Sequence, residues 1–288
     1  MRHMRKWLAL ALALVLALAL AVPALAATAT WEKMVEGNSV LAPESAYTPA
    51  SVQTALAAYQ KYLDAKSGSQ AEKDAYNNEF KPAILNLEFK AHSFTDAPKG
   101  MWYDKALNFV GSTGKMNGVA PGVFNPQDTM TRAMAVTILW RMNGEPAPKK
   151  AANFSDVPAG QWFSNAIAWA VENNITNGTS PTTFSPNTPV TREQMATFFS
   201  RMILALAGQS GTGLSPAAMR AALAKQYPDA AQISTYALEH VLICLQTGVM
   251  KGNADGTFAP QAPITRAQGA QMLMNYYYFL LEQTFRTL

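Results

Sequence analysis

Cysteine and histidine are scarce in this chain of 288 residues, and their scarcity excludes several kinds of site. Cys244 is the single cysteine, so no disulfide can form within the chain. Zinc sites need three or four ligands, and only His92 and His240 accompany Cys244 beyond the first 26 residues. We therefore expect no metal and no other cofactor. Between Ile243 and Leu245, Cys244 is typical of a small buried apolar residue.

A long transmembrane run is also missing, although the first 26 residues are strongly apolar. Arg2, Arg5 and Lys6 precede an apolar run over 8–22, which is shorter than the ~20 residues that cross a bilayer. Ala24-Leu25-Ala26 then supplies the small residues of a cleavage site. We predict that residues 1–26 are a signal peptide and that no membrane span remains after cleavage. A retained amino-terminal anchor helix is the alternative.

The rest of the chain lacks an excess of charge of either sign. Three of the 23 basic residues lie in the predicted signal peptide, which leaves 20 basic against 19 acidic residues. Nucleic acids and anionic membranes attract clustered positive charge, and no such cluster is visible. The sequence therefore predicts no nucleic-acid partner and no membrane partner.

What the chain does contain is internal repetition. Copies that begin at Phe94 and Phe154 align without a gap at an offset of 60 residues. The identical pairs include Phe94/Phe154, Asp96/Asp156, Trp102/Trp162, Gly118/Gly178, Phe124/Phe184, Thr131/Thr191 and Arg132/Arg192. A third, more divergent copy has Tyr236 at the tryptophan position and Asp229 one residue out of register, and keeps Gly252, Phe258, Thr265 and Arg266. Three copies let small units bury a core that none could bury alone.

Each copy predicts a helix, a loop and a second helix. In the second copy, apolar residues recur at helical spacing after Trp162, and an Asn-Gly turn and a loop rich in proline, serine and threonine follow. Phe184 in this polar loop is expected to fill the core. The second helices are expected over about 191–205, 131–142 and 265–281. The chain is therefore predicted to be mostly α.

The remaining segments divide the chain further. Residues 27–93 lack the repeat and predict a small helical segment, with one helix over 48–66 and another from Ala71 that Pro82 breaks. We assign this segment no function. The predicted domains are residues 27–93, repeats over 94–146, 154–206 and 226–281, and a linker over 207–225 with a helix at 215–225.

The start of each second helix is explained by capping. Thr191 with Gln194, and Thr265 with Gln268, match the capping box, in which the threonine and glutamine side chains each satisfy a backbone N–H. Met134 takes the glutamine position in the first copy, so its capping box is incomplete. No part of this arrangement needs an arginine.

An arginine nevertheless follows each capping threonine. A cation in the first turn is disfavoured by roughly 0.3–1 kcal/mol, because the helix amino terminus carries partial positive charge. A planar guanidinium beside spare backbone N–H groups is a good carboxylate receptor, so the recurrence predicts an external anion. The alternative is an arginine folded over an apolar neighbour or paired with an acid. The residues concerned are Arg132, Arg192 and Arg266.

Taken together, Phe-x-Asp, Trp-aromatic, the Asn-Gly turn, Phe-x-Pro and Thr-Arg resemble the S-layer homology (SLH) domain, in three tandem copies over about 94–281. The resemblance implies an exported protein held non-covalently on a bacterial cell wall. It implies a pseudo-threefold helical bundle whose inter-repeat grooves bind secondary cell-wall polysaccharide. Pyruvate-ketal groups on that polymer would supply the carboxylate that Arg132, Arg192 and Arg266 contact.

Other residues of the motif have two interpretations each. Trp102, Trp162 and Tyr236 either belong to the core or stack on a sugar ring. Asp96, Asp156 and Asp229 either have a structural role, such as helix capping, or neutralise an arginine. Gly118, Gly178 and Gly252 are expected to adopt positive φ and, by the resemblance, to border the ligand groove. Departures from the family pattern, such as Met134, put equal affinity among the three grooves in doubt.

A wall-binding module is the leading hypothesis, and it predicts that Arg192→Ala weakens binding to wall sacculi without unfolding the protein. An exported structural or partner-binding surface protein is the alternative, with residues 27–93 mediating assembly and the repeats as anchor. Catalysis on wall glycan is disfavoured, because no convincing carboxylate pair and no nucleophile with its base are visible.

Overall fold

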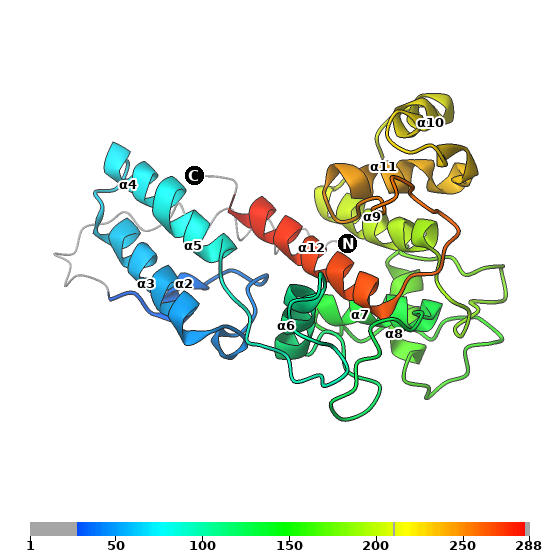
Figure 1. Cartoon of the computed structure of the whole chain (residues 1–288), viewed down its shortest axis with the longest axis horizontal. Helices are drawn as coiled ribbons and strands as arrows, with labels where there is room; N and C mark the ends of the chain where they lie inside the picture. Colours follow the sequence, from blue (N-terminus) through cyan, green and yellow to red (C-terminus); the bar gives the residue numbers. More distant parts are fainter. Residues whose placement is uncertain (1–27, 210, 286–288) are drawn as a thin grey trace. The chain divides into compact units, whose positions relative to one another are not determined.

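The structure, a computed structural model, describes residues 28–209 and 211–285, so the predicted signal peptide lies outside the described residues. Helices and connecting loops make up this part of the chain (Figure 1). Within it, β-structure is limited to isolated bridges, as predicted for a mostly α chain. None of the helices in the described ranges is both long enough and apolar enough to span a membrane.

The chain forms two compact units. The first, here called the amino-terminal unit, holds the described residues up to Ser93 together with Leu107–Gly114 and the residues from Tyr277 onward. The second, here called the repeat unit, holds Phe94–Ala106 and Lys115–Tyr276. The last part of the chain therefore belongs with its beginning, which the repeat pattern did not reveal.

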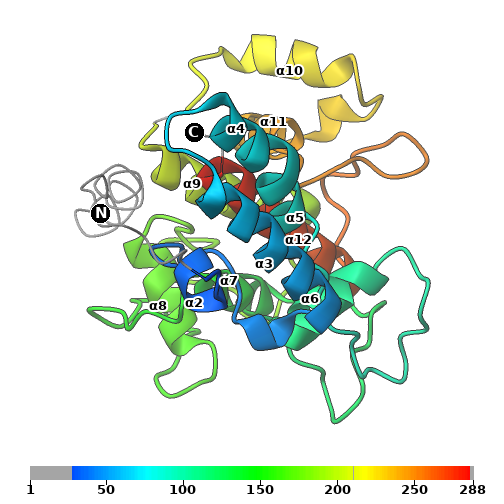
Figure 2. The ribbon, with the colours of Figure 1, turned by 90° about the vertical axis from the view of Figure 1, so that its left-hand side faces the viewer.

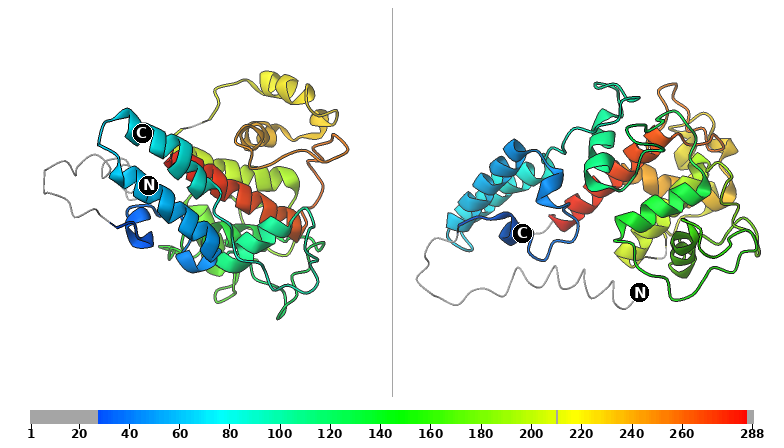
Figure 3. Two further views of the ribbon diagram at one scale, coloured as in Figure 1. Left: turned by 60° about the vertical axis from the view of Figure 1, so that its left-hand side comes forward. Right: turned by 90° about the horizontal axis from the view of Figure 1, so that it is seen from below.

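Helices α2 (Trp31–Met34), α3 (Pro49–Asp64), α4 (Gln70–Asp74) and α5 (Lys81–Leu85) form the start of the amino-terminal unit. Helix α3 begins where predicted, because the Thr48 side chain accepts a hydrogen bond from the Ser51 N–H. It packs against α5 and the π-helix before it, and the blue and cyan helices lie side by side in both views of Figure 3.

The expected break at Pro82 is wrong. A π-helical segment, Ala75–Phe80, joins α4 directly to α5, and Pro82 lies in the first turn of α5. Proline is excluded from helix interiors because it lacks an N–H and crowds the carbonyl four residues earlier. A π turn already departs from that bonding pattern, so it accommodates the proline without ending the helix.

Aromatic rings fill the core of the amino-terminal unit. Phe89 contacts Phe109 and Tyr277, with ring centroids 5.0 and 5.6 Å apart. The hydroxyl oxygens of Tyr47 and Tyr277 are 2.5 Å apart, and the Tyr76 hydroxyl donates to the Phe285 carbonyl at 2.9 Å. The first and last described segments thus share one core.

The predicted helix pairs are present, and most of their residues lie in the repeat unit. The first helices are α6 (Asp104–Thr113), which continues into the amino-terminal unit, α8 (Ser164–Glu172) and α11 (Leu238–Gln246). The second helices are α7 (Arg132–Met142), α9 (Arg192–Ala207) and α12 (Arg266–Thr284), of which α12 also extends into the amino-terminal unit. The predicted linker helix is α10 (Pro216–Ala224), capped by Ser215, and it packs on α11 (Figure 2).

Backbone hydrogen bonds close the three repeats into a ring. The Met130 N–H donates to Ile264 O at 2.8 Å, Ile264 donates to Val190 O at 3.0 Å, and Val190 donates to Met130 O at 2.9 Å. Each residue directly precedes the capping threonine of its repeat, so all three repeats contribute the same position. This cyclic pattern is what a pseudo-threefold arrangement requires.

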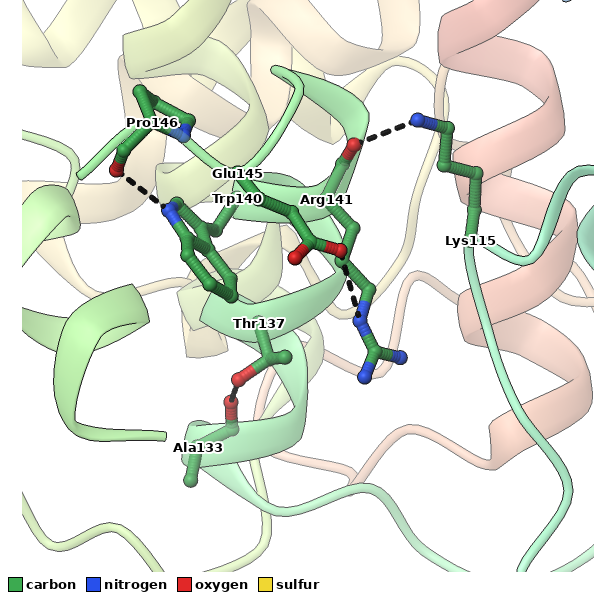
Figure 4. A network of polar contacts seen from close by, with 7 residues as sticks. All are labelled: Lys115, Ala133, Thr137, Trp140, Arg141, Glu145 and Pro146. Atoms are coloured by element: carbon green, nitrogen blue, oxygen red, sulfur yellow. Dashed lines mark hydrogen bonds and ion pairs between the residues drawn. The ribbon is translucent and has the colours of Figure 1, made fainter. Parts of the chain in front are cut away.

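The carboxyl end of α7 is fixed by polar contacts within the first repeat (Figure 4). The Lys115 ammonium donates to Arg141 O at 2.7 Å, where the helix leaves carbonyls without intrahelical partners. Arg141 also faces Glu145 at 3.8 Å, and the Trp140 indole donates to Pro146 O at 2.9 Å. Helix α7 therefore ends near its predicted boundary.

Candidate ligand-binding junctions between the repeats

Threonine caps start all three second helices as predicted. Thr191 Oγ1 accepts from the Gln194 N–H at 3.4 Å, and Gln194 Oε1 accepts from the Thr191 N–H at 3.3 Å. Thr265 and Gln268 repeat this box. In the first repeat the Thr131 cap accepts from the Met134 N–H at 3.2 Å, and methionine cannot return the bond.

The next two amides of each helix bond to the loop of the following repeat. Arg132 N–H donates to Thr188 O at 2.9 Å, and Ala133 N–H donates to Pro186 O at 3.0 Å. The same bonds recur from Arg192 and Glu193 to Ala262 and Pro260, and from Arg266 and Ala267 to Asp128 and Pro126. The prediction of spare N–H donors for an anion is therefore wrong, because the fold itself uses these groups.

The three arginine side chains are buried, with exposed fractions of 3, 4 and 5% for Arg132, Arg192 and Arg266. Each Nε donates to a phenylalanine carbonyl of the next repeat in cyclic order, and each guanidinium lies over that phenylalanine ring. The Nε–O and guanidinium–centroid distances are 2.9 and 4.7 Å to Phe184, 2.6 and 4.9 Å to Phe258, and 2.7 and 4.5 Å to Phe124. We call each arginine with its phenylalanine an arginine clamp, and each clamp marks one junction: 1–2 at Arg132, 2–3 at Arg192 and 3–1 at Arg266.

Burial lowers the pKa of all three guanidiniums, but arginine keeps its charge in proteins. The alternative prediction, an arginine folded over an apolar neighbour, is therefore partly correct. The apolar neighbour is the phenylalanine ring of another repeat. Arg192→Ala would remove donors from buried carbonyls as well as any ligand contact. We therefore expect Arg192→Ala to destabilise the repeat unit, contrary to the expectation that it leaves the fold intact.

The aspartates that recur in the three repeats hold the phenylalanine loops. Asp156 accepts from the Phe184 and Ser185 N–H groups at 2.9 and 2.7 Å. Asp96 does the same for Phe124 and Asn125, and Asp229 for Phe258 and Ala259, despite its shift in register. Asn125, Ser185 and Ala259 have φ of 53, 60 and 52°, a left-handed conformation that costs energy without glycine. The aspartates stabilise that strained turn, and so position the carbonyl that each arginine binds.

Two of the three glycines differ from expectation. Gly178 has a φ of +83°, as predicted, but Gly118 and Gly252 are not in the positive-φ region. At Gly118 an added Cβ would lie 2.5 Å from Val123 O, and at Gly252 it would overlap the Tyr227 ring. Close approach of the neighbouring chain, not backbone conformation, therefore requires glycine at these two positions.

The three aromatic residues that precede the first helices are exposed, so the core interpretation is wrong. Trp102, Trp162 and Tyr236 are 58, 56 and 53% exposed. Each tryptophan makes an edge contact with the aromatic residue after it, Tyr103 or Phe163, at 5.2 and 5.1 Å between centroids. Such a flat, partly fixed apolar face is suited to a sugar ring.

Glu193 is a residue that the sequence interpretation missed. It is 3% exposed, and its carboxylate accepts from the Ser234 N–H at 3.0 Å, the Ser234 hydroxyl at 2.8 Å and the Tyr236 hydroxyl at 2.9 Å. The other copies have Ala133 and Ala267 at its position. This paired change, glutamate in one repeat and tyrosine in the next, is the signal that could have identified the contact.

Within residues 28–209 and 211–285, no group of three or more histidine, cysteine, aspartate or glutamate side chains could hold a metal ion. Cys244 is buried and donates to Ala196 O at 3.3 Å, as predicted for a core residue. His240 Nδ1 lies 3.1 Å from Ser200 Oγ, and burial lowers the pKa of His240 to about 4. Cys244 is therefore part of the core, whereas His240 is half-buried.

The model of the S-layer homology domain family matches residues 93–135, 153–196 and 226–270. The chain is 34% identical over 166 residues to "Surface-layer 125 kDa protein" of Lysinibacillus sphaericus, covering 56% of this chain and 13% of that protein. It is 31% identical over 183 residues to "Endoglucanase" of Bacillus sp. (strain KSM-635), covering 64% and 18%. It is 27% identical over 172 residues to "Cellulosome-anchoring protein" of Acetivibrio thermocellus, covering 57% and 36%. The chain therefore spans less than a fifth of the length of the first two relatives.

Proposed function

Because this chain carries three tandem S-layer homology domains, we propose that it attaches non-covalently to a bacterial cell wall by binding an anionic wall polysaccharide at the junctions between its repeats. The observation that supports this best is the recurrence of a buried guanidinium and an exposed aromatic ring in the repeats. Surface-layer and cellulosome-anchoring proteins among the relatives agree with a location at the cell surface.

The chemistry of the junctions fits an acidic sugar. A carboxylate, such as that of a pyruvate ketal, would be drawn to the positive charge of Arg132, Arg192 or Arg266. A sugar ring would stack on the exposed faces of Trp102 and Trp162. The role of Asp96, Asp156 and the glycines Gly118, Gly178 and Gly252 is then to shape the loops beside the bound polymer.

The similarity to an endoglucanase does not support catalytic activity in this chain. The match covers only 18% of that protein and coincides with the repeats. An assembly role for residues 27–93 also lacks a supporting observation. The large exposed apolar side chains of the described residues are Met101, Trp102, Val119, Trp162, Leu214 and Tyr236, and none lies in that segment.

Sedimentation with native wall sacculi and with sacculi stripped of their polymer tests the proposal. We expect the intact protein to sediment with native sacculi only. Replacing Trp102 and Trp162 together by alanine should weaken this binding roughly tenfold, because aromatic stacking on the ring is lost. Leu214→Ala is the matched control, since Leu214 is a similarly exposed apolar residue in the linker.

Both tryptophans are more than half exposed, so the double variant should keep the wild-type melting temperature. Equal binding of the wild-type protein to native and stripped sacculi would overturn the proposed function.

A further inference from the structure

The three arginine clamps share the Nε bond but differ at the second guanidinium nitrogen. Arg192 Nη2 donates to Lys251 O at 2.8 Å, and Arg266 Nη2 donates to Asn117 O at 2.8 Å. Arg132 Nη2 is buried and has no hydrogen-bond partner among the residues that the structure describes. A buried charged donor without an acceptor is destabilising, and native structures satisfy nearly all such groups.

The position that corresponds to Lys251 and Asn117 in the second repeat is Asn177. The glycine after it, Gly178, has a φ of +83°, whereas Gly118 and Gly252 lie outside the positive-φ region. A different φ at this glycine indicates that the peptide before it is rotated relative to the equivalent peptides of the other two repeats. The Asn177 carbonyl is therefore not presented to Arg132 as its counterparts are to the other arginines.

Thr176 explains why this peptide is turned. Its hydroxyl oxygen accepts the Gly178 N–H at 3.3 Å, which fixes the peptide orientation in a local side-chain turn. The first and third repeats have Met116 and Met250 at this position, and a thioether offers only a weak acceptor. At this position, a hydroxyl thus distinguishes the second repeat from the other two.

We propose that the 1–2 junction is the carboxylate-binding site of the chain, that Thr176 keeps Arg132 available for the ligand, and that Arg192 and Arg266 are structural clamps. The inference rests on the proposed function. The carboxylate oxygen accepts from Arg132 Nη2, in the place of the backbone carbonyl that accepts from Nη2 of the other two arginines. Asn117 and Lys251 are exposed residues, so the residues whose carbonyls accept from Arg266 and Arg192 lie at the surface.

The surroundings of the 1–2 junction also suit a sugar acid. The loop of the second repeat carries a cluster of hydroxyl groups, in which Thr179 Oγ1 lies 2.8 Å from Ser185 Oγ and Ser180 Oγ lies 2.7 Å from Thr183 Oγ1. The Tyr236 phenol and the Asp156 carboxylate are within electrostatic reach of Arg132, as the Tyr227 phenol and the Asp229 carboxylate are of Arg192. By contrast, the first loop exposes the apolar Val119, and the third loop exposes the carboxylate of Asp255.

Thr176→Met tests this inference, because it gives the second repeat the residue found in the other two. The Asn177–Gly178 peptide should then adopt the orientation of the equivalent peptides in the other repeats, and the Asn177 carbonyl should accept from Arg132 Nη2. We expect binding to native sacculi to weaken by roughly tenfold or more, which corresponds to the loss of one charge-assisted hydrogen bond. Thr176→Ser is the matched control, since it keeps the hydroxyl and should bind as the wild type does.

Lysine variants keep the test decisive if Thr176→Met does not fold. The single lysine nitrogen can still donate to the phenylalanine carbonyl, but lysine has no counterpart of the arginine Nη2. We expect Arg132→Lys to lose sacculus binding, and Arg192→Lys and Arg266→Lys to retain it with lower melting temperatures. Wild-type binding by Arg132→Lys or by folded Thr176→Met would overturn the choice of junction while leaving wall attachment intact. Failure of the wild-type protein to prefer native over stripped sacculi would instead refute the proposed function.

Discussion

The amino-terminal unit and the repeat unit are stabilised by different interactions. The first is built on buried rings, such as Phe89, Phe109 and Tyr277, whose contacts depend mainly on volume. The second is closed by directed bonds, in which a guanidinium, a phenylalanine carbonyl and an aspartate carboxylate recur at each junction. Because the same directed bonds recur at every junction, they fix the geometry of each junction more tightly than apolar packing alone would. The repeats can therefore diverge elsewhere in sequence and still form the same kind of junction.

Removing an arginine clamp should have the largest effect. Arg192→Ala leaves the carbonyls of Phe258 and Lys251 without their donors, and we expect it to lower the free energy of unfolding by about 4 kcal/mol. Arg132 makes one bond fewer, so Arg132→Ala should cost about 1–2 kcal/mol less. Urea unfolding followed by circular dichroism measures both values.

Lys150→Ala, at an exposed position between the repeats, provides the control and should change stability little. Equal losses for Arg132→Ala and Arg192→Ala would contradict the difference between their junctions.

The helix starts could be predicted from the sequence because capping is local. Thr191 and Gln194 are three residues apart, and no distant contact is needed to recognise their box. The repeat pattern likewise predicted the helix pairs and the buried phenylalanines. It could not predict the destination of the arginines, because Arg132 bonds to a residue 52 positions away and Arg266 to one 142 positions away.

Contacts between residues far apart in the sequence also explain the other differences between the predictions and the structure. Gly252 has to be glycine because the Tyr227 ring approaches it from another part of the repeat. The sequence-based prediction considered only the residues next to Gly252 and therefore attributed the glycine to a positive φ. The exposure of Trp102 and Trp162 depends on which faces the other repeats cover. The aspartates reach across a loop to residues 28–30 positions away, so their role in holding it was visible only in three dimensions.

A smaller effect is expected in the amino-terminal unit. Tyr47→Phe removes the hydroxyl that bonds to the Tyr277 hydroxyl and accepts from the Ala42 N–H at 3.1 Å, but it keeps the ring, so it should cost about 2 kcal/mol in unfolding free energy. Tyr62→Phe is a suitable comparison, because the half-buried Tyr62 makes ring contacts with Phe80 and Tyr59. A cost for Tyr47→Phe as large as that for Arg192→Ala would mean that this unit also depends on directed bonds.

The smallest difference between the units should appear in their response to acid. Burial, followed by the positive charge of Arg201, lowers the pKa of His240 from 6.5 to about 4 in the repeat unit. The unfolded chain therefore binds a proton first as the pH falls, so this residue destabilises the fold progressively between pH 6.5 and 4 and adds no further slope below that range. Tyr47 and Tyr76 of the amino-terminal unit, whose pKa burial raises from 10.0 to about 12, are neutral in both the folded and the unfolded chain over this range and contribute no acid dependence. As the pH is lowered, amide hydrogen exchange should therefore accelerate in α9 and α11 before it accelerates in α3. The His240→Gln variant should not show this order. Equal acceleration in all three helices of the wild-type protein would show that His240 does not set the acid response.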